Sequence, residues 1–208
     1  MATMNFEFML TALPGILLGL TVHEYCHALA AWKLGDSTAR DQGRLTLNPI
    51  KHIDILGFVF ILFAGFGWAK PVQFNPENLS NFRRDKALIA VAGPVSNFAL
   101  GVLLVGMVRA VLHFQIDINA ILFNVLFFGA FINFGLFVFN LLPIPPLDGS
   151  HIVFSGLNLR PEIENRIRRI GMPVLVLILV AQNFANITIL PIGRIVGALV
   201  EFFLRGTP

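Results

Sequence analysis

The chain has 208 residues, of which 56% are hydrophobic and 13% charged, and its formal net charge is +3. A soluble domain carries about 25% charged residues, and here the apolar residues fall in long blocks, so the composition argues against an ordinary soluble domain and indicates a multi-pass membrane protein. The basic excess does not indicate a nucleic-acid partner. Basic residues collect in the cytoplasmic loops of membrane proteins, and no stretch interleaves basic and aromatic residues on a polar surface.

The first apolar block covers about residues 6–34, which is long enough to cross a bilayer as one helix, and Gly35, Asp36 and Ser37 end it. Residues 44–48 then alternate between polar and apolar as a short strand would, and residues 72–74 do the same. Between them, the second apolar block at 55–68 would be about 21 Å long as a helix, against about 30 Å for the hydrocarbon core.

The distribution of basic residues favours a second block that enters the membrane and returns. If block 55–68 crossed the membrane, the lysines and arginines before it and after it would lie on opposite faces, against the positive-inside rule. If the block returns, they share the cytoplasmic face. We therefore predict a re-entrant segment, which is tolerated where irregular backbone is buried in protein.

Two further long apolar blocks follow at 87–112 and 120–142, and the second of these is rich in phenylalanine. Three prolines in the segment 143–149 exclude a regular helix there. After an arginine-rich stretch, the last apolar region at 170–204 is divided in two by polar residues near 182–186 and by Pro191.

These elements predict an all-α polytopic membrane protein with about five to six transmembrane helices, a re-entrant segment and a small β element near the active site. The length suits a single membrane-embedded domain, residues 1–208. Its catalytic core would cover about 6–157, and its C-terminal helices about 170–204.

A His-Glu-x-x-His motif lies at residues 23–27 inside the first apolar block. Residues i and i+4 lie on one face of a helix, so the imidazoles of His23 and His27 can reach one Zn²⁺. Glu24 lies close enough to act as a general base toward a metal-bound water. The composition of the chain gives a chance expectation of about 0.003 such motifs, and ionisable groups inside a membrane helix are costly and normally functional.

A catalytic zinc needs a third protein ligand and one open position. Asp148 is the candidate, because it follows the proline-rich end of the fourth apolar block; the alternative is that it only caps a helix beginning at Gly149. With a re-entrant second block, the first and fourth blocks both end on the cytoplasmic side, so Asp148 can lie at the depth of His23 and His27. We therefore predict one Zn²⁺ per chain.

Three motifs together resemble the site-2 protease family of intramembrane metalloproteases, in its compact form without a PDZ domain. They are His-Glu-x-x-His at 23–27, Gly-Pro-x-x-Asn at 93–97, and Asn-Leu-Leu-Pro at 140–143 continuing to Leu-Asp-Gly at 147–149. The resemblance implies zinc held by His23, His27 and Asp148, with Glu24 activating water. Ser150 stands where the family often has a second glycine, a change that we expect to be tolerated.

Asn97 and Asn140 are the remaining candidates for a functional role. Buried amides must find hydrogen-bond partners, so both residues could simply join helices together. The resemblance implies instead that one or both bind the substrate backbone or the developing oxyanion.

The resemblance implies a metalloendopeptidase that cuts peptide bonds in or near transmembrane segments of membrane proteins, as in regulated intramembrane proteolysis. Its partners would be a transmembrane protein substrate and the lipid bilayer, in a prokaryotic cell membrane with the active site towards the cytoplasm. A substrate helix must unwind before hydrolysis, and the alternating stretches at 45–48 and 72–74 could form a sheet edge that accepts it. The alternatives are a metal-ion transporter and a non-catalytic membrane binding protein of the same fold; the presence of Glu24 favours the enzyme.

Overall fold

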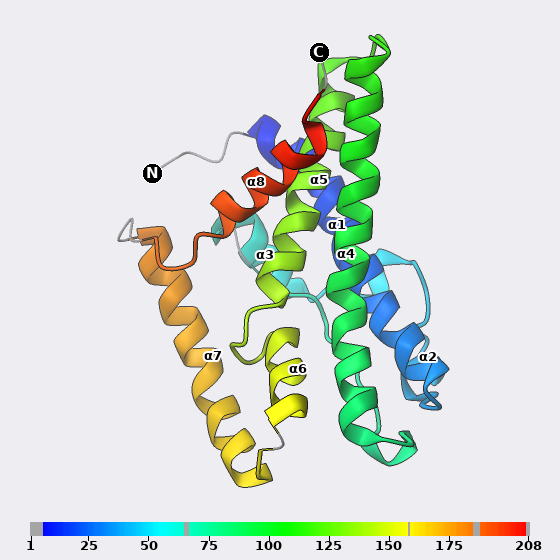
Figure 1. Cartoon of the computed structure of the whole chain (residues 1–208), viewed down its shortest axis with the longest axis vertical. Coiled ribbons are helices and arrows are strands. Elements are labelled where there is room, and N and C mark those ends of the chain that lie inside the picture. Colours follow the sequence, from blue (N-terminus) through cyan, green and yellow to red (C-terminus); the bar gives the residue numbers. More distant parts are fainter. Residues whose placement is uncertain (1–5, 65–66, 158, 185–187, 207–208) are drawn as a thin grey trace.

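The computed structural model describes residues 6–64, 67–157, 159–184 and 188–206, and the regular secondary structure in this part of the chain is all helical. In chain order the helices are α1 (Phe6–Lys33), α2 (Thr38–Asp41), α3 (Ile55–Ala64), α4 (Phe82–His113), α5 (Ala120–Asn140), α6 (Asp148–Leu157), α7 (Pro161–Phe184) and α8 (Ile192–Leu204) (Figure 1). Short 3₁₀ turns lie at Pro49–Lys51 and Pro76–Asn78. The prediction of an all-α protein is confirmed.

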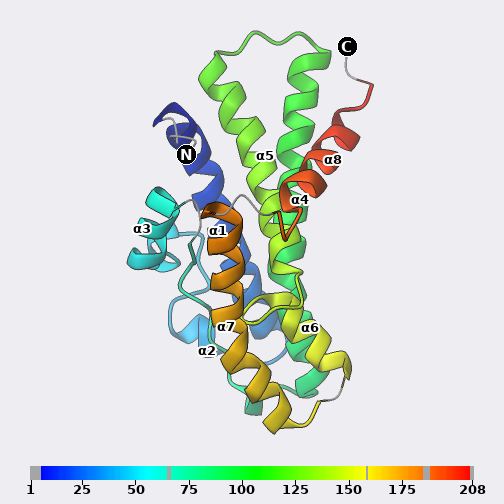
Figure 2. The ribbon, with the colours of Figure 1, turned by 90° about the vertical axis from the view of Figure 1, so that its left-hand side faces the viewer.

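Among the described residues, three helices are long and apolar enough to cross a membrane, namely Met9–Lys33 within α1, the whole of α4 and the whole of α5. Figure 1 shows α1 and α5 running in one direction and α4 in the opposite direction, and Figure 2 shows the same arrangement from the side. Helices α3 and α6 have ten residues each, which is about 15 Å and too short to cross. The expected number of five to six spans is therefore not confirmed.

The three long helices pack closely where glycine replaces larger side chains. A Cβ added at Gly15 of α1 would lie 2.6 Å from the Cα of Gly129 in α5, and one added at Gly101 of α4 would lie 2.8 Å from the ring of Phe134. Small residues of this kind let helix backbones approach one another in a membrane. A buried core cluster joins α8 to α4 and α5, and it consists of Val105, Ala130, Phe134, Val196 and Val200.

The chain leaves the bundle before α3 and returns to the same place after it. Ile53 and Ala69 form an isolated antiparallel β-bridge, and the backbone N–H of Lys70 donates to the carbonyl oxygen of His52 at 2.8 Å. The two ends of this apolar segment are thus hydrogen-bonded to each other, whatever the path of the chain between them.

The small β element predicted at 44–48 and 72–74 is not confirmed. That single bridge is the β pairing found in the described part of the chain. At the first stretch, the side chains of Thr46 and Asn48 accept hydrogen bonds from the backbone N–H groups of Asn48 and Ile50, which produces a turn instead of a strand. At the second, the N–H of Val72 donates to a side chain instead of a neighbouring strand.

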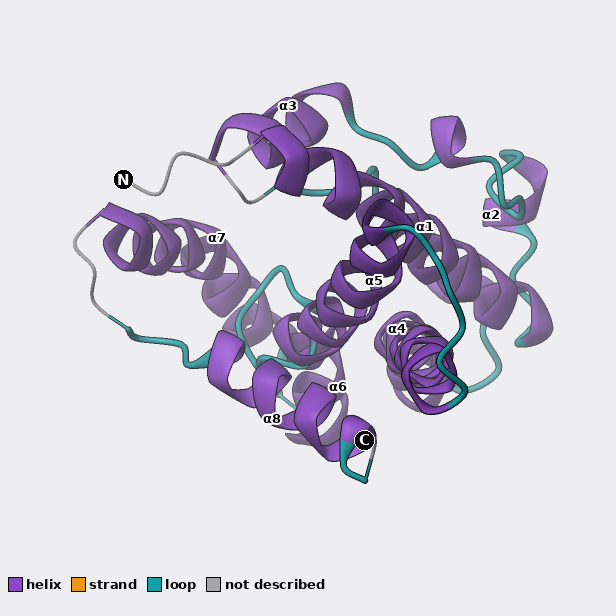
Figure 3. Cartoon of the chain, turned by 90° about the horizontal axis from the view of Figure 1, so that it is seen from above, coloured by secondary structure: helices purple, strands orange, loops and turns teal. Residues whose placement is uncertain are grey.

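The C-terminal helices differ from the prediction mainly at their start. Helix α7 begins at Pro161, not near residue 170, so it includes the arginine-rich stretch. Proline suits the first position of a helix because its missing N–H would have no helical partner there. Seen from above, α7 lies at the edge of the molecule, away from α4 (Figure 3). The expected division before Pro191 is confirmed, although residues 185–187 lie outside the described part.

Candidate metal centre

The fold brings His23, His27 and Asp148 together, as the sequence predicts. The two histidines lie one turn apart on α1, and Asp148 is the first residue of α6. One ligand atom from each of the three lies within 4.8 Å of the others. The Oδ2 atom of Asp148 is 3.1 Å from Nε2 of His23 and 3.3 Å from Nε2 of His27, and both histidines are buried.

The outer nitrogens of both rings face oxygen atoms. Nδ1 of His27 lies 2.7 Å from the carbonyl oxygen of Ile89, and Nδ1 of His23 lies 2.6 Å from Oδ1 of Asn97. A carbonyl oxygen can only accept, so each Nδ1 carries a hydrogen, and in the neutral ring Nε2 then keeps its lone pair. Metal-ligating histidines in proteins are held in this manner.

With both rings neutral and protonated at Nδ1, the inner atoms of the site have no hydrogen to share. The two Nε2 atoms are 3.0 Å apart, and two lone pairs at this distance repel. Asp148 Oδ2 is buried and has no hydrogen-bond partner among the described residues, although both rings lie within ion-pair distance. Two imidazole nitrogens and one carboxylate oxygen converging in this way are a suitable donor set for a divalent metal.

Gly93 of α4 forms the wall beside the two rings. A Cβ at this position would lie 2.6 Å from Nε2 of His23 and even closer to Nε2 of His27. A glycine is therefore needed for α4 to approach the metal-binding atoms. The hydroxyl of Ser96 donates to the carbonyl oxygen of Gly93 at 2.6 Å, which ties the residue within the turn that contains Pro94.

Glu24 is held in place by a segment distant in the sequence. Its Oε2 accepts a hydrogen bond of 3.0 Å from the backbone N–H of Val72, and its side chain is buried. Two residues earlier, the carbonyl oxygen of Lys70 accepts from Nη2 of Arg44 at 2.5 Å. Arg44 is buried; this burial lowers its pKa below the ordinary value, and the nearby charge of Glu24 partly opposes the shift.

The two predicted amides occupy different places. Asn97 is fully buried, and its Nδ2 donates to the carbonyl oxygen of Gly19 and to Oδ1 of Asn133, each at 3.0 Å. With Oδ1 accepting from His23, Asn97 has no free donor for a substrate in this arrangement. Asn140 is the last residue of α5, and its Nδ2 donates to the carbonyl oxygen of Leu136 at 3.0 Å. The predicted role of both residues at the substrate is untested.

Arg44, Val72 and Asn133 belong to this site. Asn133 is absent from the sequence-based prediction, and Arg44 and Val72 appear in it only as members of the alternating stretches, without a role toward Glu24. Asn133 could have been noticed, because it is an amide in the middle of a phenylalanine-rich block. Arg44 and Val72 carried no such signal, since their role arises from contacts with residues far away in the sequence.

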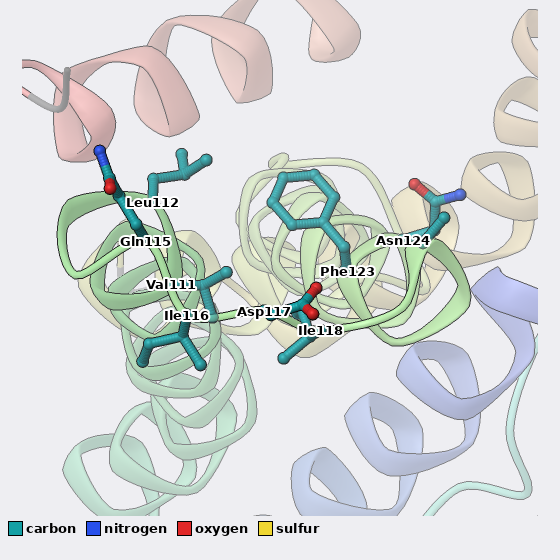
Figure 4. Close-up of a pocket in the computed structure, with 9 residues that line it drawn as sticks. Val111, Leu112, Gln115, Ile116, Asp117, Ile118, Phe123 and Asn124 are labelled. Carbon is teal, nitrogen blue, oxygen red and sulfur yellow. The ribbon is translucent and has the colours of Figure 1, made fainter.

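A second concave surface lies at the other end of the bundle, at the turn between α4 and α5 (Figure 4). Its volume is about 600 Å³, and Gln115, Asp117 and Asn124 are its polar lining residues. None of the residues that the sequence predicts for the metal centre lines it.

The described part of the chain is helical and includes helices long enough to cross a membrane. Its His-Glu-x-x-His motif is completed by a distant aspartate. These features are typical of a membrane protein with a metal-binding site. Comparisons with known proteins make this class specific. The sequence profile of Peptidase family M50 matches residues 106–182. The protein named "Putative zinc metalloprotease YwhC" of Bacillus subtilis is 44% identical over 142 residues, which cover 66% of this chain and 65% of that protein.

Two further relatives carry the same descriptive name. Rip2 of Mycolicibacterium smegmatis is 32% identical over 176 residues, covering 81% of this chain and 66% of the relative. MJ0611 of Methanocaldococcus jannaschii is 31% identical over 153 residues, covering 72% of this chain and 73% of the relative. The chain belongs to peptidase family M50, which confirms the resemblance to site-2 proteases. It spans slightly less than two thirds of YwhC and Rip2, and no solved structure matches it.

Proposed function

We propose that the chain is an intramembrane zinc metalloprotease that hydrolyses peptide bonds in or near transmembrane segments of membrane proteins. The observation that carries the proposal is the convergence of two Nε2 atoms from α1 and the Oδ2 atom of Asp148 from α6, within 4.8 Å of one another. The relatives, each named "Putative zinc metalloprotease", support the same activity and the same metal.

His23, His27 and Asp148 would hold the zinc. Two neutral imidazoles and one carboxylate are three protein ligands, the number found in catalytic zinc sites that keep one position open. A bound zinc supplies Lewis-acid activation of the water and of the scissile carbonyl. The ring orientations set by Ile89 and Asn97 keep the lone pairs of both histidines directed inward.

Glu24 would move the proton. The backbone N–H of Val72 holds Oε2 of Glu24, and the other carboxylate oxygen would take a proton from the attacking water. The same carboxylate would then deliver this proton to the leaving amine, so Glu24 acts first as general base and then as general acid.

The arrangement around α3 supports a re-entrant segment and a cytoplasmic site. Because Ile53 is bridged to Ala69, the two ends of the apolar segment between them cannot lie on opposite faces of a bilayer. The basic residues on both sides of that segment then share one face, as the positive-inside rule requires for the cytoplasm. In a prokaryotic cell the site would then lie on the inner side of the cell membrane.

Under this proposal α1, α4 and α5 cross the membrane, fewer than the five to six spans expected from the sequence. Helix α7 has 24 residues, but its apolar half reaches only about 18 Å and does not cross alone. Its charged first half would lie at the cytoplasmic face and its apolar second half in lipid. Helix α8 has 13 residues, which reach about 20 Å and do not cross alone.

An unwound substrate needs backbone partners near Glu24. Gln73 is exposed, and neither its backbone N–H nor its carbonyl has a partner among the described residues, whereas its neighbour Val72 donates inward to Glu24. We propose that the substrate backbone pairs with this extended segment, as peptides do at sheet edges. A proline at Gln73 would remove the N–H and should reduce cleavage while zinc stays bound; unchanged turnover would exclude this pairing.

The deciding experiment compares Glu24→Gln and Asp148→Ala in purified full-length protein, with a helix-destabilised model transmembrane substrate and with or without a zinc chelator. Glu24→Gln should retain stoichiometric zinc and lose cleavage, whereas Asp148→Ala should lose zinc as well. Glu77→Gln and Asp117→Ala are matched controls, because both side chains are exposed. Full cleavage by Glu24→Gln would refute the mechanism, and zinc uptake into vesicles without any cleavage would indicate a transporter instead.

A further inference from the structure

Two buried amides lie beside the metal centre on two different helices. Asn97 of α4 and Asn133 of α5 are both 0% exposed, and they are hydrogen-bonded to each other. A buried amide in an apolar bundle is costly unless its donors and acceptors are satisfied. The partners of both amides are all defined, so the orientation of each can be worked out.

The orientation of Asn133 is set by two backbone carbonyls. Its Nδ2 lies 2.8 Å from the carbonyl oxygen of Gly129, in its own helix, and 3.4 Å from that of Gly15 in α1. Both of these oxygens can only accept, so the NH₂ group must face them. Oδ1 of Asn133 is therefore left facing Nδ2 of Asn97.

The orientation of Asn97 follows from that of Asn133. Both N–H groups of Asn97 face acceptors, namely Oδ1 of Asn133 and the carbonyl oxygen of Gly19, each at 3.0 Å. Oδ1 of Asn97 must then face Nδ1 of His23, 2.6 Å away. Because Oδ1 has no hydrogen to give, His23 must donate from Nδ1, and its Nε2 is left with a lone pair towards the metal site.

Glycines make this chain of hydrogen bonds possible. A Cβ at Gly19 would lie 2.7 Å from Oδ1 of Asn133, and one at Gly15 would lie 2.6 Å from the Cα of Gly129. Larger residues would separate α1 from α5 and remove the carbonyl oxygens from the reach of the amides. Each of these oxygens has a second lone pair, so it can accept from an amide as well as from its own helix.

We propose that Asn133 is a positioning residue of the metal centre, acting through Asn97 to hold His23 in the tautomer whose Nε2 can bind a metal. The proposal rests on the metal site and not on proteolysis. Asn97 serves in this role as the link between α5 and the histidine. Without Asn133, only the carbonyl oxygen of Gly19 holds the NH₂ group of Asn97 in place. The turned-over amide, which presents NH₂ to Nδ1 and favours the wrong tautomer of His23, then becomes less unfavourable.

The test is zinc affinity of the full-length protein in detergent, measured by chelator competition without substrate. Asn133→Leu should bind zinc about 10- to 100-fold more weakly, the loss typical for a partner of a metal-ligating histidine. Asn124→Leu is the matched control, because it makes the same change at an exposed position of the same helix. Unchanged affinity in a folded Asn133→Leu protein would overturn the proposal.

A second measurement tests the unaltered protein as well as the variant. Nitrogen NMR of histidine-labelled, metal-free protein should show His23 protonated at Nδ1 and not at Nε2, and Asn133→Leu should increase the Nε2-protonated form. A purely structural role of Asn133 would leave the tautomer unchanged. If the unaltered protein carried the hydrogen on Nε2, the proposal would be wrong even if Asn133→Leu failed to fold. A protein that binds zinc as expected but cleaves nothing would refute only the protease function.

Discussion

The carboxylate of Glu24 is hydrogen-bonded to the backbone N–H of Val72, at 3.0 Å and across 48 positions of the sequence. The carbonyl oxygen of Lys70, two residues before Val72, is held by Arg44, and its N–H is bonded to His52. The position of the proposed general base therefore depends on the loop between α1 and α4 as well as on the helix that carries it.

Replacing Arg44 should slow cleavage while zinc stays bound. Arg44→Met removes the donor that holds Lys70 and leaves the carbonyl oxygen of that residue without this partner. A hydrogen bond to a charged group contributes about 1.5–3 kcal/mol, so we expect a roughly 10-fold or greater loss of kcat, measured with the model substrate. Arg40→Met is the control, because Arg40 is exposed and its ion-pair partner Asp41 is exposed as well. Equal rates for the two variants would show that Arg44 does not position Glu24.

Gly93→Ala should damage the metal centre directly. The added methyl group would overlap Nε2 of both His23 and His27, so either the rings or α4 must move. We expect zinc affinity to fall at least about 10-fold, since displaced ligands no longer share one metal position. Gly106→Ala on the same helix is the control, because a Cβ there meets nothing within 4 Å. Zinc titration of both variants decides the question, and equal affinities would contradict the close approach of α4.

Asp36 should make stability depend on pH in the acid range. Its buried carboxylate accepts hydrogen bonds from Thr38, from the backbone N–H of Asn75 and from the side chain of Asn78. Burial alone would raise the pKa of Asp36, but these hydrogen bonds lower it below the ordinary value. A lowered folded-state pKa stabilises the protein above the unfolded-state value of about 3.9, and this stabilisation is lost as the pH falls through the folded-state pKa.

Asp36→Asn should therefore lower the unfolding temperature at pH 7, and its difference from the unaltered protein should shrink below about pH 4. Each donor left unsatisfied costs about 1–3 kcal/mol. Asp41→Asn serves as the exposed control and should change little. Thermal unfolding in detergent at both pH values measures the effect, and a difference that does not vary with pH would contradict the assignment.

Glu164 should stabilise the packing of α7 against the rest of the protein through its ion pair with Lys86 of α4. Its Oε1 lies 2.7 Å from Nζ of buried Lys86 in α4 and 2.6 Å from Nη2 of Arg168. Arg168 also contacts Nδ1 of His151 in α6, at 2.9 Å. Burial, together with the charges of Arg168 and Lys86, lowers the pKa of His151 to about 4, so this histidine is neutral near pH 7 and adds no further positive charge.

Glu164→Gln should destabilise the protein by about 3 kcal/mol, because it leaves the buried ammonium of Lys86 without its counter-charge. Hydrogen exchange should then increase in α7 more than in α4 or α5. Glu162→Gln, an exposed neighbour on the same helix, should have neither effect. Unaltered exchange in α7 would mean that other contacts hold this helix.

Local sequence patterns were sufficient for the three long helices and for the two histidines of the candidate metal centre. Long apolar blocks predict the three membrane-length helices, and the i, i+4 spacing of His23 and His27 places both rings on one face. The prediction of Asp148 needed a second argument, namely that the fourth apolar block, which precedes it, and the first apolar block end on the same side of the membrane. This argument came from the distribution of basic residues over the whole chain, not from the residues around the aspartate.

The strands at 44–48 and 72–74 could not be judged from alternation alone. Whether such a stretch pairs with another strand depends on where its N–H groups find acceptors. Here the acceptors are side chains, some nearby, as at Thr46, and some distant, as at Glu24. The role of Asn133 was hidden for a related reason, because its partners lie on α1 and α4, and a sequence pattern cannot identify neighbours on other helices.

The pairing of Ile53 with Ala69 also has a mechanical consequence. Because the two ends of the segment that contains α3 are hydrogen-bonded to each other, a movement of α3 should be transmitted only weakly to the residues beyond the bridge. Thinning or thickening of the surrounding lipid would therefore shift α3 while Lys70 and Val72 keep their positions. In the proposed re-entrant arrangement, a change in bilayer thickness should therefore affect α3 more than the carboxylate of Glu24, which is bonded to Val72.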